Sequence, residues 1–83
     1  MKFKAEIQIM PHKEILDPQG KAVMLGLHNL GFQNVNQVRV GKHIDLYVDA
    51  SSADEASEKV EEACKKLLAN VIMESYSFKI LEE

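Results

Sequence analysis

Apolar and polar residues alternate strictly at the start of the chain. Phe3, Ala5, Ile7 and Ile9 are apolar, and the even positions between them are charged or polar. A period of two is typical of a strand with one buried face. Pro11 lacks a backbone donor, so we expect this strand to end there.

A helix is predicted over residues 18–30. Asp17 is an N-cap acceptor and Pro18 suits the first helical position, where a missing N–H costs nothing. Gly31 can adopt the left-handed conformation that ends many helices. The apolar positions that follow helical spacing are Val23, Leu27 and Leu30.

Two further strands are predicted around a turn that begins at Gly41. The apolar residues are Val38 and Val40 before the turn, and Ile44, Leu46 and Val48 after it. A two-residue turn at Gly41 and Lys42 would place these two sets on opposite faces of the hairpin. A three-residue loop over residues 41–43 places all of them on one face, so we expect that loop.

A second helix is predicted to follow Ser52, which forms a capping-box pattern with Glu55. The apolar stripe of this helix consists of Ala56, Val60, Ala63, Cys64 and Leu67. The helix is expected to reach Ala69, and Asn70 closes it. A last strand is predicted over residues 71–81, but its apolar residues change parity near Glu74 and Ser75, which predicts a bulge or a change of pairing partner.

The element order is therefore βαββαβ, which predicts an α+β, ferredoxin-like fold: a four-stranded antiparallel sheet with two helices on one face. We expect a single domain over residues 1–83. A chain of 83 residues builds a small core. The bare second sheet face and the two-parity last strand predict burial against another chain, in a homodimer or homotetramer.

Charge and composition exclude several classes of protein. Thirteen acidic and ten basic residues give a net charge of −3, which disfavours binding to nucleic acid. An RNA-binding sheet would need exposed aromatic residues, and Tyr47 alone is available in the middle strands. No apolar run approaches the roughly 20 residues of a bilayer span, so no membrane segment is expected. The lone Cys64 fits the cytoplasm.

The sequence offers little for catalysis. Cys64 lies on an apolar helix stripe, where a small packed side chain is the simpler interpretation. His12, His28 and His43 fall on three different elements without metal-ligand spacing. Asp45 and Asp49 share a strand face that alternation alone explains. We therefore expect no catalytic residue and no metal site.

Two segments carry residue types that such a fold does not by itself require. Gly20 lies in the first turn of a helix, where glycine is unfavourable by about 1 kcal/mol relative to alanine. It would permit close approach of another backbone, or of a ligand, to the positive end of the helix. The second segment is a basic tip over residues 38–42. Good turn and cap chemistry would also explain both segments.

The motifs together resemble a known family. They are Leu16-Asp17-Pro18-Gln19-Gly20, Val38-Arg39 with Gly41-Lys42, Cys64 with Leu67-Leu68-Ala69-Asn70, and Glu74 with Tyr76. In content and spacing, over nearly the whole chain, they are similar to the PurS family, the small subunits of phosphoribosylformylglycinamidine synthase. Glu14 stands where the family commonly has glycine, and Val71 where it has proline.

The resemblance implies a non-catalytic subunit of a three-component amidotransferase in purine biosynthesis. A glutaminase subunit releases ammonia, a large synthetase subunit activates an amide with ATP, and the small subunit joins them and assists ammonia transfer. The complex uses ATP, Mg and glutamine, whereas the small subunit binds no cofactor.

Six residues are our candidates for partner contacts: Asp17, Gln19, Gly20, Arg39, Gly41 and Lys42. The planar fork of Arg39 suits a carboxylate or phosphate on the partner. The alternative hypothesis is a small-molecule regulatory module of ferredoxin-like type that uses the helix end at Gly20 as an anion site.

Overall fold

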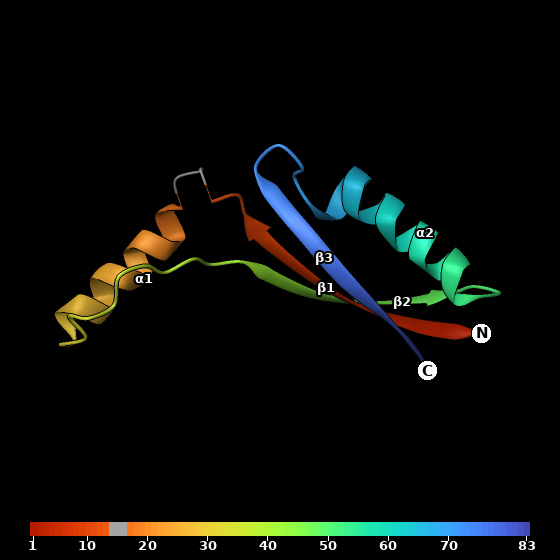
Figure 1. Ribbon diagram of the computed structural model, residues 1–83, viewed down its shortest axis with the longest axis horizontal. Helices are drawn as coiled ribbons and strands as arrows, with labels where there is room; N and C mark the ends of the chain where they lie inside the picture. Colours follow the sequence, from red (N-terminus) through yellow and green to blue (C-terminus); the bar gives the residue numbers. More distant parts are fainter. Residues whose placement is uncertain (14–16) are drawn as a thin grey trace.

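A computed structural model describes residues 1–13 and 17–83 as an α+β fold of three strands and two helices (Figure 1). The elements are β1 (Lys2–Pro11), α1 (Pro18–Asn29), β2 (Lys42–Asp49), α2 (Ala53–Ala63), the π-helical turn η1 (Cys64–Leu68) and β3 (Glu74–Glu82). Neither described helix is long and apolar enough to cross a membrane.

The central strand of the sheet is β1. The strand order is β2-β1-β3, and both pairs are antiparallel. Ile7 pairs with Ile44 on one side and with Phe78 on the other. The odd residues of β1 therefore share a face with the apolar residues of both neighbours, as the alternating sequence predicts.

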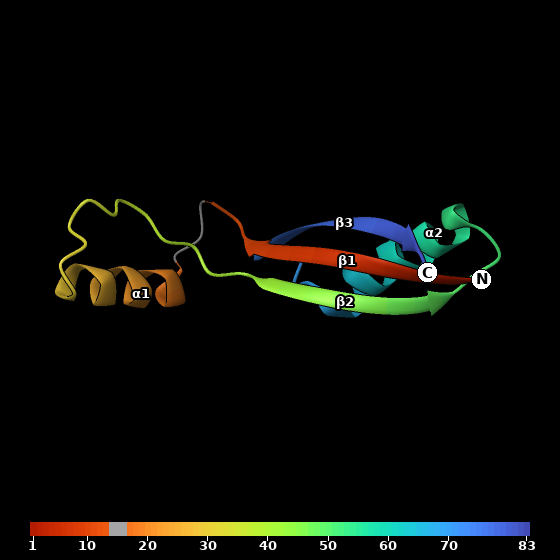
Figure 2. The ribbon, with the colours of Figure 1, turned by 90° about the horizontal axis from the view of Figure 1, so that it is seen from below.

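The core lies between this face and α2, which covers it from one side (Figure 2). The buried apolar residues are Phe3, Ala5, Ile7 and Ile9 of β1, with Ala50, Ala56, Val60, Cys64 and Ala69. The predicted apolar stripe of the second helix is thus confirmed at Ala56, Val60 and Cys64, and Ala63 is partly buried. Leu67, by contrast, is 83% exposed.

The predicted four-stranded sheet is wrong for the described residues, because residues 38–40 do not form a strand. The hairpin over residues 41–43 is wrong as well, since β2 begins at Lys42 and pairs with β1. The cause is a contact with a residue distant in the sequence: the backbone N–H of Val40 donates to the carboxylate of Asp17 at 2.9 Å instead of to a neighbouring strand.

The first helix stands away from the sheet, so the prediction that two helices cover one face is also wrong (Figures 1 and 2). Gly20 is the one buried residue of α1. The molecule measures 51 × 26 × 14 Å, with a radius of gyration of 16.4 Å. A compact chain of this length would have a radius of gyration of about 12 Å.

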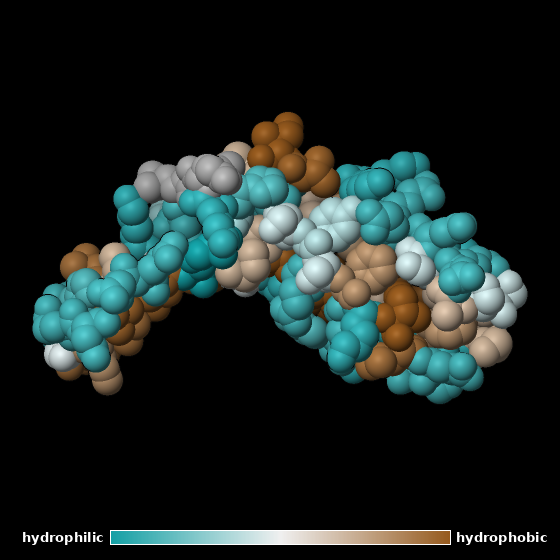
Figure 3. Space-filling model, in the orientation of Figure 1, coloured by the Kyte–Doolittle hydropathy of each residue, from teal (hydrophilic) through white to brown (hydrophobic). Residues whose placement is uncertain are grey.

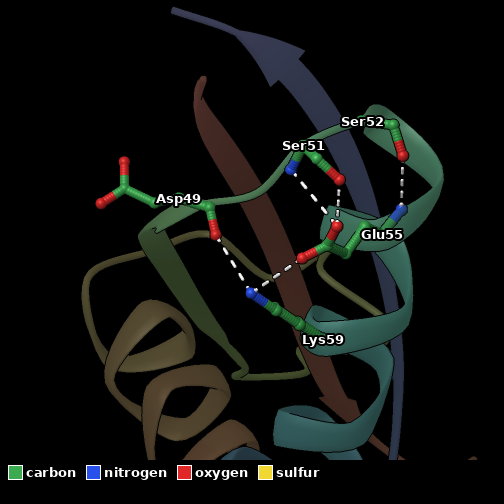
Figure 4. A network of polar contacts seen from close by, with 5 residues as sticks. All are labelled: Asp49, Ser51, Ser52, Glu55 and Lys59. Atoms are coloured by element: carbon green, nitrogen blue, oxygen red, sulfur yellow. Dashed lines mark hydrogen bonds and ion pairs between the residues drawn. The ribbon is translucent and has the colours of Figure 1, made fainter.

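Both helices begin and end much as the sequence predicts. Gly31 has a φ of 101°, and the N–H groups of Gly31 and Phe32 donate to carbonyls of the last helical turn, which is a Schellman motif. The Ser52 hydroxyl accepts from the Glu55 N–H at 3.2 Å. Glu55 does not complete the capping box, because its carboxylate accepts from Ser51 and pairs with Lys59 at 3.2 Å (Figure 4).

The last strand begins at Glu74, later than predicted. Residues 71–73 form a turn before it, so the change of parity needs no bulge within the strand. The uncovered sheet face is mostly polar, as the charged and polar even positions of β1 indicate. Its side chains include Lys4, Glu6, Gln8, His43, Asp45, Tyr47, Ser77 and Lys79.

Candidate partner-binding site at the start of the first helix

Asp17 holds together the beginning of α1 and the segment that precedes β2. One carboxylate oxygen accepts from the Gly20 N–H at 3.0 Å, as the N-cap pattern predicts. The other accepts from the Val40 N–H at 2.9 Å. The hydrogen bond from the Gly20 N–H is the main cause that lowers the pKa of Asp17, and the bond from the Val40 N–H is the next largest. The carboxylate therefore fixes where α1 leaves the sheet.

Gly20 is required by the close approach of another backbone. A Cβ built at this position would lie less than 3.0 Å from the carbonyl oxygen of Val38, and 2.7 Å from an Asp17 oxygen. Of the two explanations left open by the sequence, the structure supports the approach of a backbone. The Gly20 N–H also already donates to Asp17, which weakens the alternative of an anion site at this helix end.

Gly41 allows the chain to pass the end of β1. A Cβ there would lie less than 3.0 Å from the sulfur of Met10 and the carbonyl oxygen of Ile9. The next residue, Lys42, pairs with Glu74 at 3.7 Å and donates to the Leu68 carbonyl at 3.5 Å. This part of the basic tip thus ties together the ends of β1, η1 and β3.

Arg39 also points back to its own chain, with one guanidinium nitrogen donating to the carbonyl oxygen of Pro11. Gln19 differs from the other candidates. Its side chain is exposed, and no hydrogen bond joins it to another described side chain or backbone group. Gln19 is therefore the candidate that the internal contacts of the described chain explain least.

Two of the six candidates, Asp17 and Gln19, line a surface hollow of about 450 Å³. Its lining residues are Pro11, Asp17, Pro18, Gln19, Val40, Asn70, Met73 and Glu74. The structure thus brings together residues from the start of α1, the end of β1 and the turn before β3. Leu16 and Glu14, which the sequence comparison singled out, lie outside the described residues.

The chemistry of the remaining groups fits packing rather than catalysis. Cys64 is fully buried, and burial raises the pKa of its thiol. The Tyr76 hydroxyl donates to Glu61 at 2.6 Å, and this bond is the main cause that raises the pKa of Tyr76 to about 12. Among the described residues, no group of three or more His, Cys, Asp and Glu side chains is placed to hold a metal ion.

Two surface features of the structure were not predicted from the sequence. The first helix exposes Val23, Leu25 and Leu30, at 45%, 61% and 76%. The turn before β3 exposes three consecutive apolar side chains, those of Val71, Ile72 and Met73. The parity break in the last predicted strand was the available signal for this turn.

Comparison with known proteins gives a consistent family. A family model described as "PurS: Phosphoribosylformylglycinamidine (FGAM) synthase" matches residues 4–82. The chain is 40% identical over 78 residues to the phosphoribosylformylglycinamidine synthase subunit PurS of Synechocystis, covering 94% of this chain and 78% of the relative. It is 38% identical to the PurS subunit of Methanocaldococcus jannaschii, with 94% of each chain covered.

Solved structures agree in fold over almost the whole chain. "Structure of PurLQS from Thermotoga maritima" contains a chain that matches with a TM-score of 0.88 at 32% identity, covering 98% of this chain and 99% of that one. Thermus thermophilus PurS matches with a TM-score of 0.83 at 40% identity, covering 100% and 99%. In both sequence and fold, the chain belongs to the PurS family of phosphoribosylformylglycinamidine synthase subunits.

Proposed function

We propose that the chain is a non-catalytic accessory subunit of phosphoribosylformylglycinamidine synthase in purine biosynthesis. It bridges the glutaminase and the ATP-dependent synthetase subunits and assists the transfer of ammonia between them. The observation that carries this proposal is the match over 98% of the chain to a chain of the Thermotoga maritima PurLQS structure. The buried Cys64 thiol supports a role without covalent catalysis.

The bridging role agrees with how the candidate residues are used. Asp17 and Gly20 hold the start of α1 against residues 38–40. Gly41 lets the chain pass the end of β1, and Gln19 remains on the surface of the hollow. A subunit that holds two others in register needs elements of fixed relative orientation. We therefore assign Gln19 to a partner contact and the other five residues to the support of that surface.

Substitution of Gln19 tests this assignment. Gln19→Ala is expected to weaken co-purification with the two larger subunits in the presence of ATP and glutamine. Gln37→Ala is the matched control, because Gln37 is also exposed and lies in the extended segment before β2. Equal binding of the two variants would show that Gln19 is not a contact. Failure of the unaltered chain to bind either subunit would reject the bridging role itself.

We also propose that the chain associates with itself through α1. The helix buries none of its large apolar side chains, and the β2 residues Ile44, Leu46 and Val48 on the core face are only partly buried. An α1 from a second copy, laid beside α2, would cover both sets of apolar residues. Such a contact would be stabilised by the burial of apolar surface, which contributes about 25 cal/mol per Å².

Light scattering after gel filtration tests self-association. The unaltered chain should elute as a dimer or tetramer, whereas Val23→Glu should shift it toward the 9.4 kDa monomer. Ala22→Glu adds the same charge at a neighbouring exposed position and serves as the control. A stable monomer of the unaltered chain would contradict the proposal.

A further inference from the structure

The first helix and the chain that follows it form one unit, which we call the arm and define as residues 18–37. The Phe32 N–H donates to the Leu27 carbonyl at 2.9 Å, and a ring nitrogen of His28 donates to the Val35 carbonyl at 2.9 Å. These bonds fold the returning chain back onto α1 (Figure 1). The arm is therefore held together by contacts of its own.

Little of the arm packs against the rest of the molecule. It extends away from the sheet in the space-filling view, with apolar side chains exposed along it (Figure 3). Gly20 is the one buried residue of α1, and it lies at the base of the arm. Within the described chain, no hydrogen bond or ion pair joins residues 21–37 to a strand or to α2. The direction of the arm therefore depends on the contacts at its base.

Two of these contacts cross between the stretches of chain that attach the arm, one stretch following β1 and the other preceding β2. The Asp17 carboxylate accepts from the Val40 N–H at 2.9 Å. The Arg39 guanidinium donates to the carbonyl oxygen of Pro11. Connecting segments act as hinges when their backbone angles can change freely. Because these two segments are tied to each other, they hold the arm in one direction.

The two carboxylate oxygens of Asp17 have separate roles. Oδ1 accepts from the Gly20 N–H at 3.0 Å and caps the helix, whereas Oδ2 accepts from the Val40 N–H outside the helix. Serine or asparagine would cap the helix about as well. Each has a single side-chain oxygen, so neither could cap the helix and also accept from Val40 with a second oxygen. The helix cap alone therefore does not require an aspartate here.

We propose that Asp17 is a clamp that fixes the direction of the arm, and that two copies associate because the arm is fixed. Asp17 is thus a positioning residue that acts through the arm. An arm that swings freely would have the binding direction only part of the time, and the apparent dissociation constant would rise in inverse proportion to that fraction. The second half of the inference rests on the proposed self-association through α1, whereas the first half does not.

The distance between two spin labels tests the clamp. The labels are attached through Asn29→Cys, at the far end of α1, and Lys79→Cys, in β3. Both positions are exposed, and the native Cys64 is buried. The measurement is made in the Val23→Glu background, at a concentration where light scattering shows a monomer, so that no second copy holds the arm.

Asp17→Asn should retain its helix content by circular dichroism but give a broader distribution of label distances than the chain with Asp17. Asp49→Asn, which removes the same charge from another exposed carboxylate, should leave the distribution narrow. With Val23 restored and the labels omitted, the dissociation constant for self-association should rise about tenfold in Asp17→Asn, as for an arm in the binding direction a tenth of the time. It should stay unchanged in Asp49→Asn.

Each outcome bears on the inference. Equal distance distributions in Asp17→Asn and Asp49→Asn overturn the clamp. So does a loss of helix content in both Asp17→Asn and Asp17→Ser, because the cap and the clamp would then not be separable. A broad distribution with an unchanged dissociation constant overturns the link to self-association. If the unaltered chain is a stable monomer, the proposed self-association fails, and the label distances still decide the clamp.

Discussion

Replacing Gly20 by alanine tests how α1 is attached to the rest of the molecule. In an ordinary helical position this change stabilises a protein by about 1 kcal/mol, because alanine is the better helix former. Here the added Cβ would lie less than 3.0 Å from the Val38 carbonyl oxygen, and that backbone atom cannot rotate away. Overpacking of this kind costs about 3 kcal/mol at the upper end of its usual range.

We therefore expect Gly20→Ala to lower the free energy of unfolding by about 2 kcal/mol, the steric cost exceeding the gain in helix propensity. Gly26→Ala in the same helix is the control, since nothing lies within 4 Å of a Cβ at that position. It should stabilise the chain by up to about 1 kcal/mol. The two variants should thus differ by about 3 kcal/mol.

The assay is equilibrium unfolding in urea, followed by circular dichroism at one fixed protein concentration, because self-association makes stability depend on concentration. The slope of the transition should stay the same for both variants. If Gly20→Ala proves as stable as Gly26→Ala, the packing of α1 against residues 38–40 is not as described, and the reasoning from the close backbone approach is refuted.

Three further predictions concern titration and reactivity. The hydrogen bond from the Tyr76 hydroxyl to Glu61 raises the pKa of Tyr76 to about 12. The stability that this bond contributes is therefore fully present below about pH 10 and is lost as the pH rises toward 12. An ultraviolet titration should show one late tyrosine ionisation, which Tyr76→Phe removes. Amide donors lower the pKa of Asp17. The contribution of its carboxylate to the free energy of unfolding is therefore present above about pH 4 and lost as the pH falls. Asp17→Asn should make the free energy of unfolding depend less on pH in the acid range. The buried Cys64 should react with a thiol reagent in denaturant but not in the native protein, and rapid native labelling would contradict its burial.

Local signals in the sequence were sufficient for the elements that depend on near neighbours. The alternation of Phe3 to Ile9 placed β1 and its buried face, and Asp17 and Gly31 marked the two ends of α1. Ser52 likewise marked the start of α2. Each of these features depends on residues within one strand or one helical turn, so the pattern alone predicts it.

Features that depend on distant partners could not be predicted in this way. Val38 and Val40 have a strand pattern, but the Val40 N–H is taken by Asp17, 23 residues earlier in the chain. Val71 and Met73 also suit a strand, and the Asn70 side chain instead folds them into a turn. The apolar positions of α1 predicted a helix face packed on the sheet, but helical spacing alone does not say what such a face packs against.

The candidate site shows the same division. The sequence identified residue types in excess of what the fold requires, and the structure brings most of them to one place. Five of the six candidates make contacts within the chain that support this surface. Their spacing along the sequence did not predict these contacts. Gln19 and residues 71–73 remain as the outward-facing part of this surface.

The most direct measurement of the central claim compares two nitrogen sources in the reconstituted synthase. With glutamine, the glutaminase and synthetase subunits should form phosphoribosylformylglycinamidine only when this chain is added. With a high concentration of ammonium salt, the synthetase subunit should form it without the chain, and the chain alone should form none under either condition. Equal glutamine-dependent synthesis with and without the chain would contradict the account.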